Sequence, residues 1–268
     1  MKIFITGHRG YVGSALLRYG FLPLECDIRD SFSVERAVQQ ASPHLVLHLA
    51  GKSQVDWCED RNNQEEVILS NVRGTYNVFE ALKRARIPGV YLSTDQIWRG
   101  GWFEEHKELS KKTAPVNFYS ASKLAAETLA GDFDGKIVRT SYLFNPKRLN
   151  GHLSDMAMGK TTSYPVFLKR SFMYLEHFCR ALVLYCDEFY KMPSVLHLAG
   201  NLTVSWWGFM KEIEKSYGFK GVVKPRFVEA PHAAPRPWFG GLDTQLAHSL
   251  GFPAVSYLDG IKEMKKDG

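Results

Sequence analysis

The sequence has no long uninterrupted apolar run and only four cysteines among its 268 residues. Charged residues interrupt every apolar stretch well before the roughly 18 residues that a membrane-spanning helix needs, so we expect no membrane partner. The cysteines form no Cys-x-x-Cys pair and no Cys/His spacing typical of a metal site. We therefore expect no metal, and reduced, mostly buried thiols at Cys26, Cys58, Cys179 and Cys186.

A concentrated run of one charge sign is also missing. Lys and Arg outnumber Asp and Glu by 34 to 28, which gives a net charge of +6, but the basic residues are spread along the chain. The only short clusters are Lys111-Lys112 and Lys265-Lys266. This distribution argues against a nucleic-acid partner, whereas a mild basic excess suits small polyanions such as a dinucleotide or a nucleotide-sugar.

The chain also lacks room for a signal or transit peptide, because Met1 leads directly into an apolar strand pattern. A cytoplasmic location is therefore our expectation. The length and a hydrophobic content of 45% suit one large α/β domain, or a main domain with a smaller lobe.

Three glycines stand between a strand pattern and a helix pattern in the first 17 residues. Gly7 allows a tight turn, Gly10 lets the backbone approach a pyrophosphate, and Gly13 lets the helix pack closely on the strand. The N-terminus of that helix then presents unpaired N–H groups and a partial positive charge to the phosphates. This stretch predicts a dinucleotide site.

Two residues compete for the adenosine end of that dinucleotide. An acidic residue about 20 residues beyond the glycines normally binds the adenosine ribose. The connection to Asp27-Ile28 is short here, and Glu25 is the acidic candidate. The alternative is Arg9 within the glycine turn, whose guanidinium is suited to pair with a 2′-phosphate.

Strand and helix patterns alternate along most of the chain, which is typical of a parallel sheet covered by helices. Strands are expected at 3–5, 21–26, 45–49, 90–92, 137–139 and 195–199. Helices are expected at 33–40 with Ser33 as N-cap, 71–84, 119–129, 172–185 and 206–217, with a short one near the C-terminus. The fold class is thus α/β: a Rossmann-type doubly wound parallel sheet with a smaller, discontinuous C-terminal substrate lobe.

The strict alternation of strand and helix patterns ends beyond Leu143, and we place the expected domain boundaries accordingly. Residues 1–145 and 171–200 form the expected NAD(P)-binding Rossmann domain. Residues 146–170 and 201–268 form the expected substrate-binding lobe. The polar stretch 99–117 reads as a long loop over the site.

Polar or small residues follow several of these strands. Ala50-Gly51, Ser93-Thr94-Asp95 and Thr140-Ser141 come at strand ends, and ligands bind at that edge of open α/β sheets. Tyr119 and Lys123 lie four residues apart, so they share one face of the expected helix. These side chains are therefore expected in one cleft.

Four motifs now match a known family. TGHRGYVG at Thr6–Gly13, HLAG at His48–Gly51, STD at Ser93–Asp95 and YSASK at Tyr119–Lys123 resemble the extended short-chain dehydrogenase/reductases. They follow in order over about half of the chain. The resemblance implies an NAD(P)-dependent enzyme of nucleotide-sugar metabolism.

Later segments narrow the resemblance. VRTSY at Val138–Tyr142, SWWGF at Ser205–Phe209 and RPWFGGLDT at Arg236–Thr244 look like segments of the dTDP-4-dehydrorhamnose reductases. The GHRG turn looks more like GDP-fucose synthase, in which the Arg contacts NADP, so NADP is favoured and NAD stays open. The chain departs from the reductase pattern at Gln96, where Tyr is usual, and at Tyr142, where Trp is usual.

The motifs and the resemblance together give the candidate site residues. Catalysis is expected from Thr94, Tyr119 and Lys123. Cofactor binding is expected from Gly7, His8, Arg9, Gly10, Tyr11, Val12, Gly13, Asp27, Ile28, Leu49, Ala50, Gly51, Asn71, Ser93, Tyr119 and Lys123. Substrate binding is expected from Gln54, Val55, Thr94, Asp95, Tyr142 and Arg236.

Structural alternatives stay open for some of these residues. Asp95 is also suited to relay a proton or cap a turn, and Asn71 to cap a helix. Tyr142 is suited to stack on the sugar or to pack in the core, and the alternative for Arg236 is a surface ion pair. His48 is expected to be a core histidine.

The expected reaction is reduction of a 4-keto-6-deoxy nucleotide-sugar, in which Tyr119 donates the proton. A Lys ammonium about 4 Å from the phenol favours the phenolate by about 4 kcal/mol, which predicts a pKa of Tyr119 close to neutral before desolvation is counted. The alternatives are an epimerase or dehydratase of the same fold and a non-catalytic, dinucleotide-binding regulatory subunit. The expected partner is a nucleotide-diphosphate-sugar, and a homodimer is an open expectation.

Overall fold

The computed structural model describes residues 1–100, 105–110, 113–229 and 234–267. Its strands are β1 Ile3–Thr6, β2 Leu22–Pro23, β3 Leu45–His48, β4 Gly89–Thr94, β5 Lys136–Thr140, β6 Leu143–Phe144, β7 Thr162–Pro165, β8 Lys169–Arg170, β9 Met173–Tyr174, β10 Val195–His197, β11 Val204–Ser205, β12 Val223–Arg226 and β13 Phe239–Gly240. Its α-helices are α1 Tyr11–Leu16, α2 Ser31–Ala41, α3 Val55–Glu59, α4 Gln64–Val67, α5 Gly74–Ala85, α6 Phe118–Asp132, α7 Pro146–Ala157, α8 Leu175–Asp187, α9 Trp206–Tyr217, α10 Gln245–Ser249 and α11 Tyr257–Asp267.

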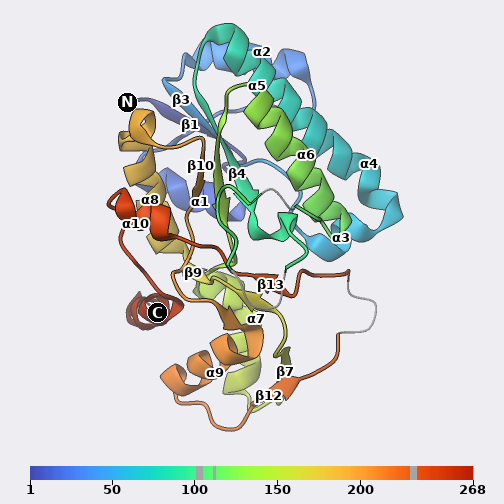
Figure 1. The fold of residues 1–268 in the computed structure, drawn as a ribbon, viewed down its shortest axis with the longest axis vertical. Coiled ribbons are helices and arrows are strands. Elements are labelled where there is room, and N and C mark those ends of the chain that lie inside the picture. Colours follow the sequence, from blue (N-terminus) through green and yellow to red (C-terminus); the bar gives the residue numbers. More distant parts are fainter. Residues whose placement is uncertain (101–104, 111–112, 230–233, 268) are drawn as a thin grey trace.

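The main sheet has six strands in the order β10-β5-β4-β3-β1-β2, and all neighbouring strands are parallel. The helices α2, α5 and α6 cover one face, and α1 and α8 cover the other (Figure 1). The strand order reverses beside β1, and this is where ligands bind in such sheets. The expected doubly wound Rossmann-type fold is confirmed.

Apolar residues on both faces of the sheet hold these layers together. All four residues of β3 are buried, as expected of a strand covered on both sides. Leu16, Phe178 and Leu182 belong to the cluster on one face, whereas Val38 and Phe79 belong to the cluster on the other. Because both clusters are buried, the carboxyl edge of the sheet is held at a fixed place.

A smaller part built around α7, α9, β7 and β12 lies below the sheet in Figure 1. Its core stacks Phe172 on Phe209, with ring centroids 4.2 Å apart, beside Phe144. Ala247 and Phe252 from the C-terminal stretch belong instead to a cluster on the main sheet. The division into two domains at the expected boundaries stays a prediction.

Several element boundaries differ from expectation. The second strand is limited to Leu22–Pro23. The helix expected at 33–40 begins at Ser31, because the Asp30 carboxylate accepts the N–H of Phe32; Ser33 instead accepts the N–H of Asp27. A π-helical turn, Ile68–Arg73, precedes α5. The helix expected at 172–185 begins at Leu175, and α7 was not expected.

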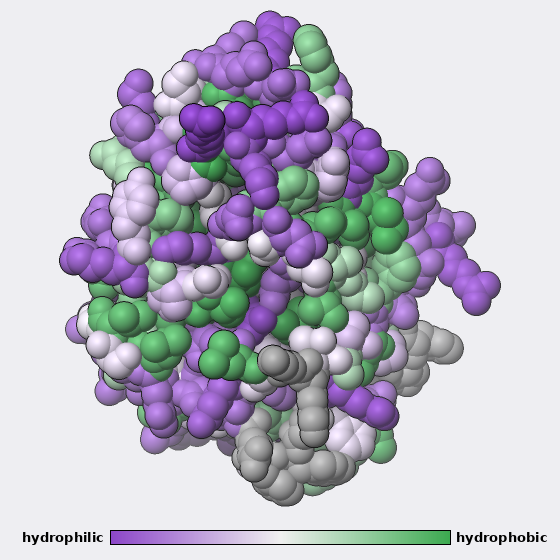
Figure 2. Space-filling view, turned by 45° about the horizontal axis from the view of Figure 1, so that its top comes forward, coloured by the Kyte–Doolittle hydropathy of each residue, from purple (hydrophilic) through white to green (hydrophobic). Residues whose placement is uncertain are grey.

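The described part of the expected loop 99–117 has no helix or long strand. His106 forms an isolated bridge with Leu242, so this loop lies against the C-terminal stretch. Residues 101–104 and 111–112 of the loop, and 230–233 of the Pro-rich stretch, lie outside the described residues. On the face drawn in Figure 2, hydrophilic residues surround smaller hydrophobic areas. No described helix is both long and apolar enough to span a bilayer.

Candidate active site

A cavity of about 1200 Å³ opens at the carboxyl edge of the sheet, between the glycine turn and the smaller part. Of the expected cofactor residues, it is lined by Gly7, Gly10, Tyr11, Val12, Gly13, Leu49, Gly51, Ser93, Tyr119 and Lys123. All the expected substrate residues line it: Gln54, Val55, Thr94, Asp95, Tyr142 and Arg236. The expected cofactor residues outside this lining are His8, Arg9, Asp27, Ile28, Ala50 and Asn71.

The glycine turn has the geometry that a pyrophosphate needs. Gly7 has φ +71°, and a Cβ there would lie 2.7 Å from the Ala50 backbone. A Cβ on Gly13 would lie 2.3 Å from the Gly7 carbonyl oxygen. Gly10, the N-cap of α1, offers no side chain to the first N–H groups of the helix. The turn therefore fits a dinucleotide, whose phosphates these groups would hold.

Arg9 and Glu25, the two candidates for the adenosine end, lie in one cluster. Arg9 Nη2 is 3.6 Å from Glu25 Oε2, and His8 Nε2 is 3.3 Å from Glu25 Oε1. Asp27 is held separately by Arg29, whose guanidinium lowers the pKa of that carboxyl to about 2. The glycine turn and the end of the second strand thus meet where a ribose or 2′-phosphate would bind.

Asn71 fixes the backbone beside the turn. Its Oδ1 accepts the Lys52 N–H at 2.7 Å, and its Nδ2 donates to the Lys52 carbonyl at 3.0 Å and to Ser122 Oγ at 2.9 Å. The side chain is buried within the π-helical turn, so the helix-cap alternative is wrong. Ile28 packs against Gly74 on the same side of the sheet.

Thr94, Tyr119 and Lys123 all face the cavity. The end of β4 supplies Thr94, and the first turns of α6 supply Tyr119 and Lys123; the Asn117 capping box fixes the start of that helix. Lys123 Nζ donates to the Leu92 carbonyl at 2.7 Å and lies 4.0 Å from the centre of the Tyr91 ring. The expected tyrosine and lysine pair is thus brought to one cleft.

The electrostatic expectation for this pair is wrong in the free protein. Burial raises the pKa of Tyr119 to about 12, although a hydrogen bond with Thr94 opposes the rise. Burial lowers the pKa of Lys123 to about 7, and the Glu127 carboxylate opposes that change. Desolvation is the largest of the causes that act on the Tyr119 pKa, so Tyr119 is a neutral hydroxyl at neutral pH.

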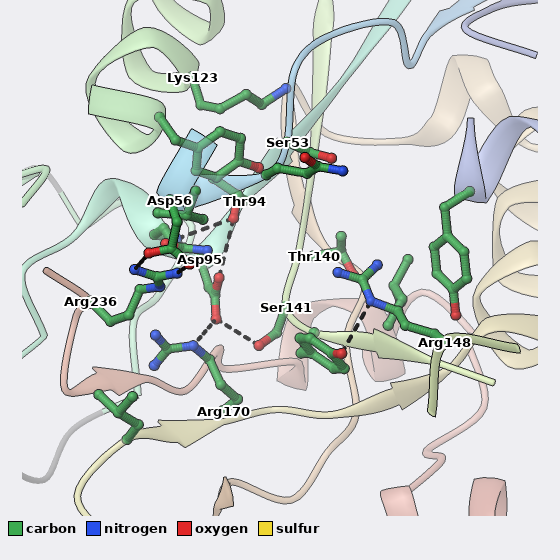
Figure 3. Close-up of a pocket in the computed structure, with 18 of the residues that line it drawn as sticks. Ser53, Asp56, Thr94, Asp95, Lys123, Thr140, Ser141, Arg148, Arg170 and Arg236 are labelled. Carbon is green, nitrogen blue, oxygen red and sulfur yellow. Dashed lines mark hydrogen bonds and ion pairs between the residues drawn. The ribbon is translucent and has the colours of Figure 1, made fainter. Parts of the chain in front are cut away.

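Asp95 lies beneath Thr94 in a buried ion pair. Its Oδ2 is 3.4 Å from Arg170 Nε and accepts the Ser141 hydroxyl at 2.6 Å, while Oδ1 accepts Thr94 Oγ1 at 3.2 Å (Figure 3). Burial raises the pKa of this carboxyl, and Arg170 opposes the rise. The Thr94 hydroxyl also accepts the Gln96 N–H, so the residue that caps this turn is Thr94 and not Asp95.

Arg236 is held by Asp56 across the mouth of the cavity. The two guanidinium Nη atoms donate to the two carboxylate oxygens at 2.9 and 2.7 Å. Asp56 also accepts the Ala234 N–H at 2.9 Å, and the arginine lowers the pKa of this carboxyl. Arg236, which we expect to bind the substrate diphosphate, is therefore already paired with Asp56 in the free protein.

Tyr142 lines the cavity and also packs against the core of the smaller part. Its ring packs against Trp206, with centroids 4.6 Å apart, and its hydroxyl accepts Arg148 Nε at 3.1 Å. Arg148 follows β6 on α7, a helix that the sequence reading did not include.

Sequence reasoning missed Arg148 and Arg170 as site residues. It did point to Asp56, because Gln54-Val55-Asp56 lies where the reductases that the chain resembles have a substrate-contacting Val-Asp pair. Arg148 and Arg170 lie on α7 and β8, where no strand or helix was expected.

His48 is a core residue, as expected. Its ring nitrogens bond Thr6 Oγ1 at 2.7 Å and Thr75 Oγ1 at 3.0 Å, and burial lowers its pKa to about 3. Within the part of the chain that the structure describes, no group of three His, Cys, Asp or Glu residues is arranged to hold a metal ion.

A dinucleotide turn at the switch point of a parallel sheet, with a threonine, a tyrosine and a lysine lining the same cleft, is the arrangement typical of the extended short-chain dehydrogenase/reductases. A family model described as the RmlD substrate binding domain matches residues 1–268. The chain belongs to this family.

Individual relatives agree with this assignment. A dTDP-4-dehydrorhamnose reductase of Mycolicibacterium smegmatis is 31% identical over 154 residues, or 53% of this chain and 46% of that protein. The chain thus spans about half the length of that relative. The spore coat polysaccharide biosynthesis protein SpsK of Bacillus subtilis is 23% identical over 98% of this chain and 96% of its own length. The crystal structure of dTDP-4-dehydrorhamnose reductase from Bacillus anthracis, in complex with NADP, is 25% identical, covers 100% of both chains and has a TM-score of 0.90.

Proposed function

We propose that the protein reduces the keto group of a 4-keto-6-deoxy nucleotide-sugar, with NADPH as the favoured cofactor and NADH as the alternative. The observation that carries this proposal is the convergence of Thr94, Tyr119 and Lys123 on a cavity that the glycine turn also lines. The dTDP-4-dehydrorhamnose reductases among the relatives support the sugar class. We also propose that residues 1–145 and 171–200 form the NAD(P)-binding domain and that residues 146–170 and 201–268 form the substrate-binding lobe.

The bound nicotinamide supplies a hydride, and the protein must supply a proton to the forming alkoxide. Tyr119 holds that proton at neutral pH, because its pKa is about 12 in the free protein. Thr94 and Tyr119 line the same cavity, and we assign the Thr94 hydroxyl the role of orienting the keto oxygen. Lys123, with a pKa of about 7, is placed to bind the nicotinamide ribose and to replenish the proton.

The nucleotide-sugar would occupy the side of the cavity lined by Gln54, Val55 and Tyr142. A diphosphate would take Arg236 from Asp56, since a dianion offers the guanidinium more charge than one carboxylate does. Asp95 is the proposed acceptor for a sugar hydroxyl, and Arg170 and Ser141 hold it in place.

Turnover with purified protein tests the proposal. NADPH and dTDP-4-dehydrorhamnose should give a falling reduced-nicotinamide absorbance. Tyr119→Phe should abolish that signal while leaving cofactor binding largely intact. Tyr76→Phe is the matched control, because Tyr76 lies outside the cavity lining and bonds Glu80.

Three results would contradict this reading. No turnover with any 4-keto nucleotide-sugar would exclude the reductase. Turnover in Tyr119→Phe would exclude Tyr119 as the proton donor. Product formed without net NADPH oxidation would instead indicate an epimerase or dehydratase.

A further inference from the structure

The Arg148 guanidinium lies over two aromatic rings, Tyr11 and Tyr142, that line the same cavity. Its Cζ lies 4.7 Å from the Tyr11 ring centre and 4.6 Å from the Tyr142 ring centre. Tyr11 is the first residue of α1, next to the glycine turn, whereas Tyr142 lies just before β6. Arg148 therefore reaches from the smaller part of the molecule to the dinucleotide side of the cavity.

The charge of Arg148 is not neutralised by the residues that the structure describes. The other two arginines at the centre of the site are paired, Arg170 with Asp95 and Arg236 with Asp56. Arg148 forms no ion pair among the described residues, and the hydrogen bond that its side chain makes there runs from Nε to the Tyr142 hydroxyl. Its two Nη groups thus keep their donors for a ligand in the cavity, which this side chain lines.

The glycine turn lines the same cavity as Arg148. No side chain caps the N–H groups that follow Gly10. A guanidinium from α7 and these N–H groups are complementary to one diphosphate lying between them.

We propose that Arg148 binds the pyrophosphate of the dinucleotide from the side opposite the glycine turn. The inference rests on the proposed function, because it requires a dinucleotide in this cleft. Arg148 then holds the smaller part of the molecule onto the cofactor, and its stacking on Tyr11 and Tyr142 orients it before binding.

A nucleotide-sugar also carries a diphosphate, and the placement of the two arginines separates the two ligands. Arg236 and Asp56 lie on one side of the cavity in Figure 3, and Arg148 lies on the other. The Arg148 side contains Tyr11 of the dinucleotide turn. We therefore assign the dinucleotide pyrophosphate to Arg148 and leave the sugar diphosphate to Arg236.

Binding titrations without turnover test the assignment. NADPH, NADH and dTDP are each titrated into the wild-type protein and into Arg148→Gln and Arg148→Lys. Arg148→Gln should weaken NADPH and NADH alike, by about tenfold, because both share the pyrophosphate. Arg148→Lys should lose less, since it keeps the charge but not the fork of donors. The affinity for dTDP should not change.

Arg73→Gln is the matched control. Arg73 is also exposed, lies 5.6 Å from the Tyr76 ring centre, forms no ion pair among the described residues and does not line the cavity. It should bind both dinucleotides as the wild type does. Equal thermal unfolding midpoints for all the variants would show that the fold is intact.

Unchanged dinucleotide affinity in Arg148→Gln would overturn the inference, and so would a loss confined to dTDP. A loss for NADPH but not NADH would overturn it too, because that pattern belongs to a 2′-phosphate contact. A wild-type protein that binds neither dinucleotide would refute the proposed function itself, whereas wild-type binding with an unaffected variant refutes only the role of Arg148.

Discussion

Replacing Arg170 with Met should destabilise the protein through Asp95. Both side chains are almost completely buried, with 6% and 3% of their surface exposed, and Arg170 Nε lies 3.4 Å from Asp95 Oδ2. Arg170 also donates to the Pro237 carbonyl at 2.9 Å. In Arg170→Met, the hydrogen-bond partners left to the Asp95 carboxylate among the described residues would be the hydroxyls of Ser141 and Thr94.

The expected cost follows from burial. Removing one partner of a buried ion pair costs about 3–5 kcal/mol, because the remaining charge is left uncompensated. Burial already raises the pKa of Asp95 and lowers that of Arg170, so desolvation opposes both charges even in the intact pair. The double variant Asp95→Asn/Arg170→Met should therefore recover much of the loss, since an amide accepts the Ser141 hydroxyl without a buried charge.

The loss should depend on pH with a definite sign. Without Arg170, the folded-state pKa of Asp95 rises further above its unfolded value of about 3.9. The raised pKa makes the folded carboxylate unfavourable as pH rises above the unfolded value, and in the variant this continues to a higher pH than in the wild type. The part of the deficit that depends on the Asp95 charge therefore grows as pH rises through the wild-type pKa towards the variant pKa, and is absent below about 4. Urea unfolding at pH 7 and at pH 5 measures the free energy of unfolding of the wild type and both variants. A deficit that is equal at both pH values, or a double variant as unstable as the single one, would refute the reasoning.

Two further predictions concern the glycine turn. Gly13→Ala should abolish NADPH binding and lower the free energy of unfolding by about 1–3 kcal/mol, because the new Cβ would lie 2.3 Å from the Gly7 carbonyl oxygen. An NADPH titration and a urea unfolding curve measure the two effects. Gly131→Ala in α6 is the control for both, since nothing lies within 4 Å of its new Cβ. Arg9→Ala should weaken NADPH much more than NADH, since only NADPH carries the 2′-phosphate; equal effects in the two titrations would show that Arg9 does not bind that phosphate.

The part of the site that lies close to strand ends could be predicted from the sequence. The parallel register of β3, β4 and β5 brings their carboxyl ends together, so Thr94 had to reach the edge where the glycine turn lies. Tyr119 and Lys123 share a helix face by spacing alone. Local periodicity was sufficient to predict that these residues lie together, because the carboxyl ends of neighbouring parallel strands meet at one edge of the sheet.

The polar partners of the site could not be predicted in the same way. Arg170 lies on a two-residue strand, β8, and meets Asp95 across 75 positions of sequence, so no periodic signal links them. Arg148 follows Asn145, which caps α7 by accepting the Arg148 N–H, a local signal that marks the helix start but not the residues it faces. The pKa of Tyr119 depended on burial, which a spacing argument does not contain.

The adenosine end shows how the structure changes a choice between two residues. Arg9 and Glu25 compete as candidates in the sequence, but the short connection after α1 places them 3.6 Å apart as an ion pair. A 2′-phosphate must therefore take Arg9 from Glu25, and it then approaches a carboxylate that no longer has its guanidinium partner. A ribose 2′-hydroxyl meets no such repulsion and can donate a hydrogen bond to the same carboxylate. The preference for NADPH or NADH thus depends on Arg9 and Glu25 together, because each residue changes the charge that the other presents to the ligand.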